Sequence, residues 1–190
     1  MVYTLEEKYD LIKQQISKLS SANPIDIVKE LMHQSFVSIH GPEHHFLDGA
    51  AFLAAYKNAG GNLNLAESLT ELAARAIKMP GAMCGQWGIC GSVASVGAAL
   101  SVIHKTGPLS DDEFYKQHME FASSVLSEMS KIGGPRCCKR NAFLSLTYGA
   151  KFVKEHYGVE MQTRKTVCEF SIFNQQCLKE KCPFYQKAKE

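Results

Sequence analysis

Residues 89–103, Ile89-Cys-Gly-Ser-Val-Ala-Ser-Val-Gly-Ala-Ala-Leu-Ser-Val-Ile103, are the most apolar stretch of this 190-residue chain. The stretch is 15 residues long and contains Ser92, Ser95 and Ser101. A helix that crosses a bilayer needs roughly 20 apolar residues, so this segment predicts a helix buried in a protein core. A chain of 190 residues is long enough to build such a core within one domain.

Helical periodicity continues on both sides of this stretch. Thr4 with Glu7, and Ser110 with Glu113, fit the capping box that opens a helix. The segments that combine a helix start with apolar residues at helical spacing are 4–19, 24–37, 42–58, 64–79, 110–129 and 135–157. Residues 161–170 are the one place for a short strand. The predicted fold is mainly α: a single-domain helical bundle of about six to seven helices.

The composition narrows the classes of protein and partner. The chain has 21 Lys and Arg against 19 Asp and Glu, so its net charge of +2 gives no reason to expect nucleic acid or an anionic membrane as a partner. The first 20 residues are charged and lack the apolar core of a signal peptide, so we expect a cytoplasmic protein. In that compartment, seven cysteines favour metal ligands or reactive thiols over a disulfide framework.

The composition changes once along the chain, and this change predicts two parts. Residues 1–163 form the helical core domain, and residues 164–190 form a Cys-rich C-terminal segment packed on it. The segment holds six Lys or Arg, three Asp or Glu and three Cys, with no apolar periodicity. Because such a segment cannot build its own core, we expect a bound metal to clip it in place.

The three cysteines of this segment predict the metal site. They follow the pattern Cys168-x8-Cys177-x4-Cys182-Pro183, and proline after the last cysteine is typical of iron–sulfur segments. The spacing fits neither a zinc ribbon nor a ferredoxin run, so zinc and a redox disulfide stay as alternatives to an iron–sulfur cluster. Three ligands leave a fourth to come from the core domain, and Cys138 is the candidate.

Two further clusters precede or bracket predicted helix starts. In His40-Gly-Pro-Glu-His-His45, the proline places His44 and His45 in a first helical turn. Cys84 and Cys90 bracket a glycine-rich turn before the apolar helix. A helix N-terminus carries roughly half a positive charge, which favours thiolate and keeps histidine neutral. These four residues are candidates for binding a cofactor, although buried core residues would show the same pattern.

A third cluster, Gly133-Gly-Pro-Arg-Cys-Cys-Lys-Arg140, predicts the reactive centre. Cys137 and Cys138 lie at another predicted helix start, and Arg136, Lys139 and Arg140 add positive charge. Both effects lower a thiol pKa, so we expect a thiolate at neutral pH, with Cys137, Cys138, Arg136 and Lys139 as catalytic candidates. The alternative is a pair of small buried cysteines. If the cluster is a site, these sulfurs should share a cavity with the two other helix starts.

The remaining motifs give no further site. His118 lies on the inner stripe of its predicted helix and is expected to be a core residue rather than a ligand. The chain lacks the phosphate-binding G-x-x-x-x-G-K-[ST] motif and the hydrolase G-x-S-x-G motif.

Taken in order, the three clusters and the cysteine tail resemble a family of uncharacterised cytosolic domains of anaerobic bacteria and archaea. The resemblance covers about residues 24–185. Members of that family occur alone or behind a SAM-dependent methyltransferase domain, so the resemblance implies that this chain is a stand-alone form. An anaerobic setting favours an iron–sulfur cluster over zinc, but the resemblance implies no reaction.

Three functions follow as expectations. The first is an iron–sulfur protein with a reactive cysteine site that performs redox or sulfur-transfer chemistry on a small molecule or a sulfur-containing substrate. The second is a non-catalytic zinc-binding module that docks on a partner enzyme such as a methyltransferase. The third is a thiol oxidoreductase in which the Cys137–Cys138 pair cycles with Cys84 or Cys90. An oligomer is compatible with all three.

Overall fold

The structure is a computed structural model that describes residues 3–186, so residues 1–2 and 187–190 of the two predicted parts lie outside it. Within the described residues the chain forms eight α-helices, two 3-10 turns and no strand. The predicted mainly helical fold is confirmed, and residues 161–170, the one place where the sequence allowed a short strand, form none. The structure has one helix more than the expected six to seven. The additional helix, Met83–Gln86, has four residues, too few to show helical periodicity in the sequence.

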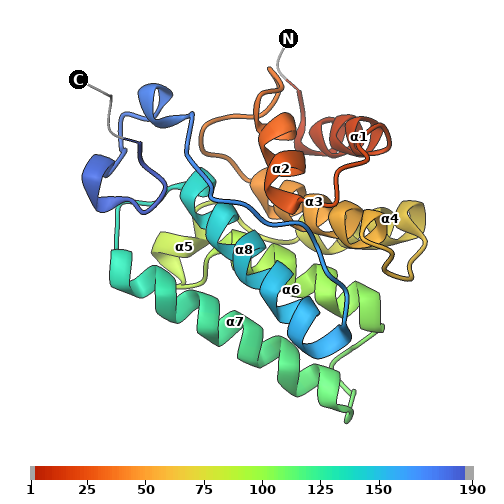
Figure 1. Cartoon of the computed structure of the whole chain (residues 1–190). Helices are drawn as coiled ribbons and strands as arrows, with labels where there is room; N and C mark the ends of the chain where they lie inside the picture. The colour runs from red at the N-terminus through yellow and green to blue at the C-terminus, as the bar shows by residue number, and fades with distance from the viewer. Residues whose placement is uncertain (1–2, 187–190) are drawn as a thin grey trace.

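The helices follow one another along the chain with short connections (Figure 1). Their bounds are α1 Leu5–Ile16, α2 Pro24–Met32, α3 His44–Asn58, α4 Leu65–Ala76, α5 Met83–Gln86, α6 Gly91–His104, α7 Glu113–Ile132 and α8 Cys138–Tyr157. The 3-10 turns are η1 Ser171–Phe173 and η2 Lys179–Lys181. None of the described helices is both long and apolar enough to span a membrane.

Helices α3 and α6 form the centre of the bundle. Every α3 residue from His44 to Tyr56 is buried, and α3 packs against α1, α2, α4, α6 and α8. Helix α6 is the apolar stretch that predicted a buried helix, and that prediction is confirmed. The two helices approach closely at Gly49, where a Cβ atom would lie 2.5 Å from the backbone oxygen of Ser95. The Gly49 N–H donates to Ser95 Oγ at 2.8 Å, which joins the two helices at this crossing.

Helix α3 begins at His44, two residues after the predicted Pro42, and two further helix starts also differ from the sequence prediction. Thr4 and Glu7 form the expected capping box, but α7 begins at Glu113 with Asp112, not Ser110, as its N-cap. The Asp112 carboxylate accepts the N–H of Tyr115 at 3.2 Å. Ser110 instead accepts the N–H of Gly107, one turn earlier in the connecting loop. The helix therefore begins later than predicted, with the Asp112 carboxylate rather than the Ser110 hydroxyl as its cap.

The start of α8 also differs, and the difference matters for the site. The sequence predicted a helix from Pro135, but α8 begins at Cys138 with Cys137 as its N-cap. The carbonyls of Gly133 and Pro135 accept hydrogen bonds from the Arg140 guanidinium, both at 3.1 Å. This holds the preceding loop outside the helix. As a result, Cys137 and Cys138 take different backbone conformations.

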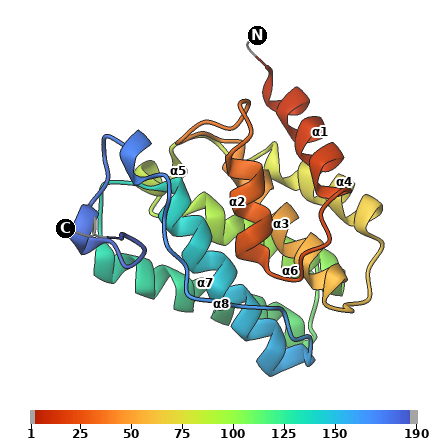
Figure 2. The same cartoon turned by 45° about the horizontal axis from the view of Figure 1, so that its top comes forward.

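The segment after α8 runs back along that helix to its N-terminal end, where η1 and η2 lie (Figures 1 and 2). The Gln162 N–H donates to the Ala22 oxygen at 3.0 Å, and the Cys168 N–H donates to the Phe184 oxygen at 2.7 Å. Phe170 is buried, and Phe184 meets Phe143 of α8 edge to face at 5.4 Å between ring centroids. The segment therefore packs on the helical body, with its cysteines next to the start of α8.

Candidate functional site

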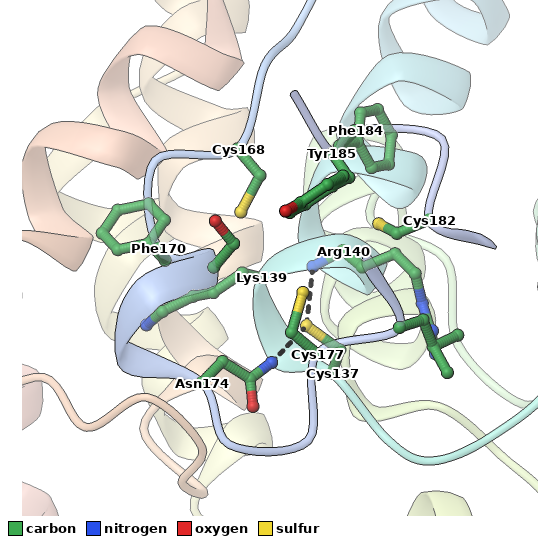
Figure 3. Close-up of a pocket in the computed structure, with 12 residues that line it drawn as sticks. Cys137, Lys139, Arg140, Cys168, Phe170, Asn174, Cys177, Cys182, Phe184 and Tyr185 are labelled. Carbon is green, nitrogen blue, oxygen red and sulfur yellow. Dashed lines mark hydrogen bonds between the residues drawn. The ribbon is translucent and has the colours of Figure 1, made fainter. Parts of the chain in front are cut away.

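Four cysteines line one cavity between the start of α8 and the C-terminal segment, and we call it the four-cysteine cavity (Figure 3). They are Cys137, Cys168, Cys177 and Cys182. The sequence assigned the fourth position to Cys138, which does not line this cavity. With the helix start shifted to Cys138, the extended N-cap residue Cys137 is the cysteine that meets the tail cysteines.

N–H groups surround the sulfurs of this cavity. Cys137 Sγ accepts from the backbone N–H of Arg140 at 3.4 Å and from the side-chain amide of Asn174 at 3.5 Å. Cys177 Sγ accepts from the Lys179 N–H at 3.4 Å. Such donors stabilise thiolates and metal-bound sulfur. The cavity therefore combines four thiols with donors that suit their charged form.

Burial opposes ionisation of two of these thiols. It raises the pKa of Cys168 and of Cys182, and the neighbouring cysteines raise both further. Arg140 acts in the opposite direction on Cys182. A bound cation would reverse this balance, because coordination removes the thiol proton.

All seven cysteines are free thiols. Among the residues that the structure describes, no group of three or more His, Cys, Asp or Glu side chains is arranged to hold a metal ion. The thiols of the four-cysteine cavity are thus neighbours in one space rather than a preformed single-ion site.

A second cavity, which we call the inner chamber, lies where α3, α5, α6 and α8 begin. Its wall contains the three predicted clusters together: Cys84 and Cys90, Cys138, and the first-turn histidines His44 and His45. Cys137 and Arg136 also line it. The structure therefore brings the three helix starts to one place, as the sequence predicted. Cys137 borders both cavities, so the two spaces are adjacent.

Buried polar atoms without a partner concentrate in this chamber. Seven such side-chain atoms occur among the described residues, and five of them belong to residues that line the chamber. These five are His44 Nδ1, His45 Nδ1, Asp48 Oδ1, Asp48 Oδ2 and Ser92 Oγ. Leaving a buried polar group unsatisfied costs about 1–3 kcal/mol, so a concentration of them is typical of a binding site.

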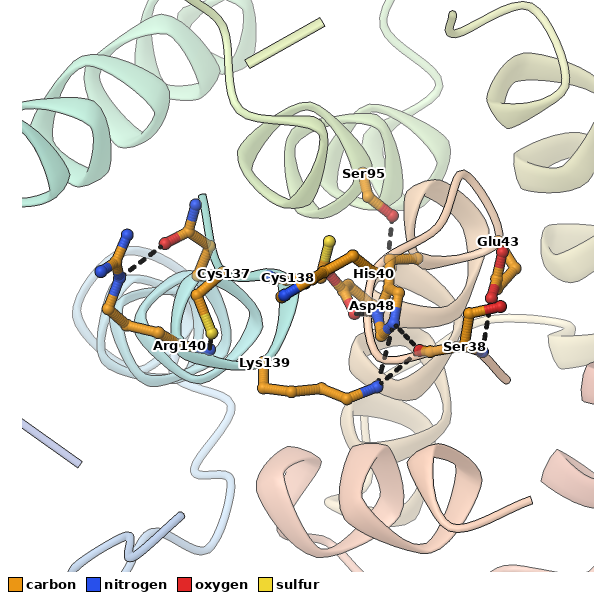
Figure 4. A network of polar contacts seen from close by, with 12 residues as sticks. Ser38, His40, Glu43, Asp48, Ser95, Cys137, Cys138, Lys139 and Arg140 are labelled. Carbon is orange, nitrogen blue, oxygen red and sulfur yellow. Dashed lines mark hydrogen bonds and ion pairs between the residues drawn. The ribbon is translucent and has the colours of Figure 1, made fainter. Parts of the chain in front are cut away.

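Lys139 of α8 reaches across to the start of α3 (Figure 4). Its ammonium donates to the Ser38 oxygen at 2.9 Å and lies 3.1 Å from His44 Nε2. On the other side of the ring, His44 Nδ1 lies 3.6 Å from Asp48 Oδ1, too long for a hydrogen bond. Lys139 is 1% exposed, and burial lowers its pKa. This lysine orients a chamber residue rather than serving the thiols.

The expected lowering of the thiol pKa at Cys138 is wrong. Burial raises the pKa of Cys138 to about 12 and also raises that of Cys90. The cations expected to act on Cys138 are directed elsewhere: Lys139 toward His44 and Arg140 toward loop carbonyls, while Arg136 is exposed. Without a bound cation, Cys138 is a neutral thiol.

The chamber histidine His45 is kept neutral, as the sequence predicted, but mainly by burial. Burial lowers the pKa of His45, and the Met79 backbone acts in the opposite direction. The ring lies directly over the start of α6. A Cβ atom at Gly91 would approach the ring carbon Cδ2 to 2.2 Å, so glycine is needed there.

An open groove of about 800 Å³ adjoins the inner chamber between α5, α7 and the loop before α8. It shares Cys84, Cys90, Arg136 and Asn141 with the chamber. Glycines, apolar residues such as Met129, and the polar residues Gln86, Ser130 and Arg140 complete its lining. The volume lies in the range of small-molecule sites. The inner chamber therefore forms the floor of a groove large enough for an organic ligand.

Sequence reasoning missed several residues of the site. Asp48 follows His44 by four residues, so helical spacing could have placed both on one face. Asn141 donates to Cys90 Sγ at 3.2 Å, and Asn174 Oδ1 accepts from His40 Nε2 at 3.1 Å. These contacts join residues far apart in the chain, and no sequence pattern indicated them.

The histidine pair of α6 and α7 lies apart from these cavities. His118 Nε2 is 3.1 Å from His104 Nδ1, and His118 Nδ1 is 3.2 Å from Thr106 Oγ1. Both ring nitrogens of His118 therefore have partners.

The fold and the cavities define an all-α protein whose seven free thiols line two adjacent cavities at the start of α8. The chain belongs to the family of unknown function DUF5714, which it matches over residues 12–185. The predicted likeness to an uncharacterised family is confirmed to that extent. No curated protein and no solved structure shows significant similarity to the chain.

Proposed function

We propose that this protein is an iron–sulfur protein whose cluster is held by Cys137, Cys168, Cys177 and Cys182. The observation that supports this is the shared cavity of these four cysteines, which come from the start of α8 and from three points in the C-terminal segment. Four thiolates are the common ligand set of such clusters. The N–H donors to Cys137 and Cys177 are the contacts that tune such a cluster.

A four-iron cluster and a single zinc ion would each require the cavity to rearrange, in different ways. Four thiolates around zinc lie about 2.3 Å from the ion, which requires the sulfurs to converge. In the described structure the four cysteines line one cavity, but their sulfurs are not arranged around a single point. The free space is about 20 Å³, so loading a four-iron cluster requires η1 and η2 to move outward. Both turns are peripheral and largely exposed, so this movement leaves the helical body intact.

The chemistry proposed for the protein is redox or sulfur transfer on a small molecule bound in the open groove. Cys137 borders both the four-cysteine cavity and the inner chamber, which forms the floor of the groove. A cluster at Cys137 would supply single electrons close to that floor. The predicted likeness to domains of anaerobes, some of them behind methyltransferase domains, fits an oxygen-sensitive centre of this kind and stays a prediction.

Anaerobic reconstitution with ferrous iron and sulfide tests the proposal. We expect brown protein with broad absorption at about 400 nm and about four iron and four sulfide per chain. Cys177→Ser should abolish the colour, whereas Cys84→Ser, whose thiol lines only the groove and the inner chamber, should retain it. Colourless protein with a tightly bound zinc that is lost in Cys177→Ser would instead support a structural zinc module at the four-cysteine cavity and overturn the proposal.

A further inference from the structure

The inner chamber has the size of an ion site. Its free volume is about 30 Å³. A cavity needs about 10–15 Å³ on this scale to hold one water molecule, so the chamber admits an ion or about two waters but no organic substrate. The small molecule of the proposed function belongs in the open groove, which leaves the chamber without an occupant.

The chamber wall carries the donor set of a soft divalent metal ion. Cys90 and Cys138 contribute thiols, His45 an imidazole and Asp48 a carboxylate. Thiolate and imidazole ligands select zinc and similar ions over magnesium or calcium. The four side chains come from three helix starts, so one ion would tie α3, α6 and α8 together.

The buried unpartnered atoms point to the same occupant. Asp48 is 0% exposed, yet neither carboxylate oxygen has a hydrogen-bond donor. His45 is 9% exposed, and its Nδ1 also lacks a partner. A cation in the chamber would satisfy these acceptors together. Ordered water could satisfy some of them, but it gives no reason for two thiols on the same wall.

Neighbouring residues hold the candidate ligands in place. The Asn141 amide donates to Cys90 Sγ, and Lys139 holds the His44 ring beside Asp48. Polar contacts of this kind orient ligands in metal sites. The absence of a side chain at Gly91 leaves room for the His45 ring.

We propose that the inner chamber binds one zinc-class divalent ion through Cys90, Cys138 and His45, with Asp48 as the fourth ligand or its carboxylate partner. In the described chain these side chains are not yet gathered around one point, so they rotate toward the ion as it enters. The ion lies at the floor of the open groove, where it would face a bound small molecule. This site is separate from the proposed cluster and does not depend on it.

The test uses the full chain carrying Cys182→Ser, which removes one ligand of the four-cysteine cavity. The metal-free protein is titrated anaerobically with Co²⁺ and then with Zn²⁺. We expect one ion per chain, the intense visible bands of tetrahedral cobalt with thiolate ligands, and displacement of cobalt by zinc. X-ray absorption of the zinc form should show sulfur and nitrogen neighbours at about 2.3 and 2.0 Å.

Variants identify which cavity holds the ion. Adding Cys90→Ser or His45→Gln should weaken binding by about 100-fold or more and change the cobalt bands. Adding Cys168→Ser, a further change in the other cavity, should leave both unchanged. Circular dichroism and urea unfolding confirm that each variant is folded, and His45→Gln gives a second reading should Cys90→Ser not fold.

The outcomes for the two proposals differ. No cobalt binding, or binding that is lost with Cys168→Ser but kept with Cys90→Ser, would overturn the inner-chamber site. Loss of the brown colour in Cys177→Ser concerns the four-cysteine cavity alone. A protein that forms no cluster but binds cobalt through Cys90 would therefore retain this inference while losing the proposed function.

Discussion

The ammonium Nζ of Lys139 lies 3.1 Å from Nε2 of His44, which joins the first turn of α8 to the first turn of α3. The same ammonium donates to the Ser38 oxygen, so two buried acceptors share one cation. His44 Nε2 also lies 3.1 Å from the Ser38 oxygen, and His44 Nδ1 lies 3.6 Å from Asp48 Oδ1 on the other side of the ring. Lys139 therefore positions the His44 ring in the wall of the inner chamber, although the lysine itself does not line that chamber.

Replacement of this lysine should destabilise the protein. Lys139→Met keeps a similar apolar stem but removes the buried donor, the ammonium over the Phe170 ring and the charge near Asp48. We expect the free energy of unfolding to fall by about 1–3 kcal/mol. Urea denaturation measures it, and Lys151→Met on the exposed face of α8 is the control, with an expected change within about 0.5 kcal/mol. Equal stability of the two variants would contradict the role given to Lys139.

The sequence was sufficient to predict the helical body and the meeting of its helix starts. The apolar stretch around α6 required a buried helix, and proline, asparagine and glycine marked most helix boundaries. Motifs rich in His and Cys at three helix starts predicted a shared site. The inner chamber is where the structure brings them together.

The sequence could not predict that Cys137, rather than Cys138, meets the cysteines of the C-terminal segment. That depends on α8 starting at Cys138, which in turn depends on the contacts of Arg140 with Gly133 and Pro135. The number of nearby cations could not predict the thiol pKa of Cys138 either, because that number takes no account of burial or of where the cations point. Asn174 reaches Cys137 only because the C-terminal segment folds back to the start of α8.

Two glycines of α6 give a matched test of the chamber geometry. At Gly91 a Cβ atom would lie 2.2 Å from the His45 ring, whereas at Gly97 nothing lies within 4 Å. Gly91→Ala should displace the ring and lower the free energy of unfolding by about 1–3 kcal/mol through overpacking. Gly97→Ala should be neutral or stabilising by up to about 1 kcal/mol, since alanine favours a helix. A stabilising effect at both positions would show that the ring is not held there.

Acid should destabilise the protein through the histidine pair of α6 and α7. Burial, with a smaller contribution from His104, lowers the pKa of His118 to about 4. The unfolded chain takes up this proton near pH 6.5, so stability present above pH 6.5 is lost as the pH falls toward 4. We expect a loss of about 1–2 kcal/mol from this group, discounted from the full shift because the ring is only half buried.

His118→Gln isolates this contribution. Carboxylates that titrate below pH 5 affect both proteins equally, so the difference between their melting temperatures carries the histidine signal. That difference should narrow between pH 7 and pH 4, because the wild type loses the stability contributed by neutral His118 and the variant has no such contribution to lose. A difference that stays constant over this range would contradict the lowered pKa of His118.

The C-terminal segment should depend on its metal for protection from proteases. Phe170 and Phe184 anchor it to the body, but Ile172 and Phe173 are 83% and 62% exposed, so little apolar area holds the turns. Lys179 and Lys181 are exposed trypsin sites in η2, beside Cys177 and Cys182. In metal-loaded protein Cys182→Ser should raise the rate of cleavage at these lysines by about tenfold or more, because a segment without its metal opens locally.

Mass spectrometry should show the body through α8 intact. Cys84→Ser, which leaves the four-cysteine cavity complete, should be cleaved at the wild-type rate. If metal-loaded and metal-free wild type are cleaved equally fast, apolar contacts alone hold the segment and the metal has no structural role there.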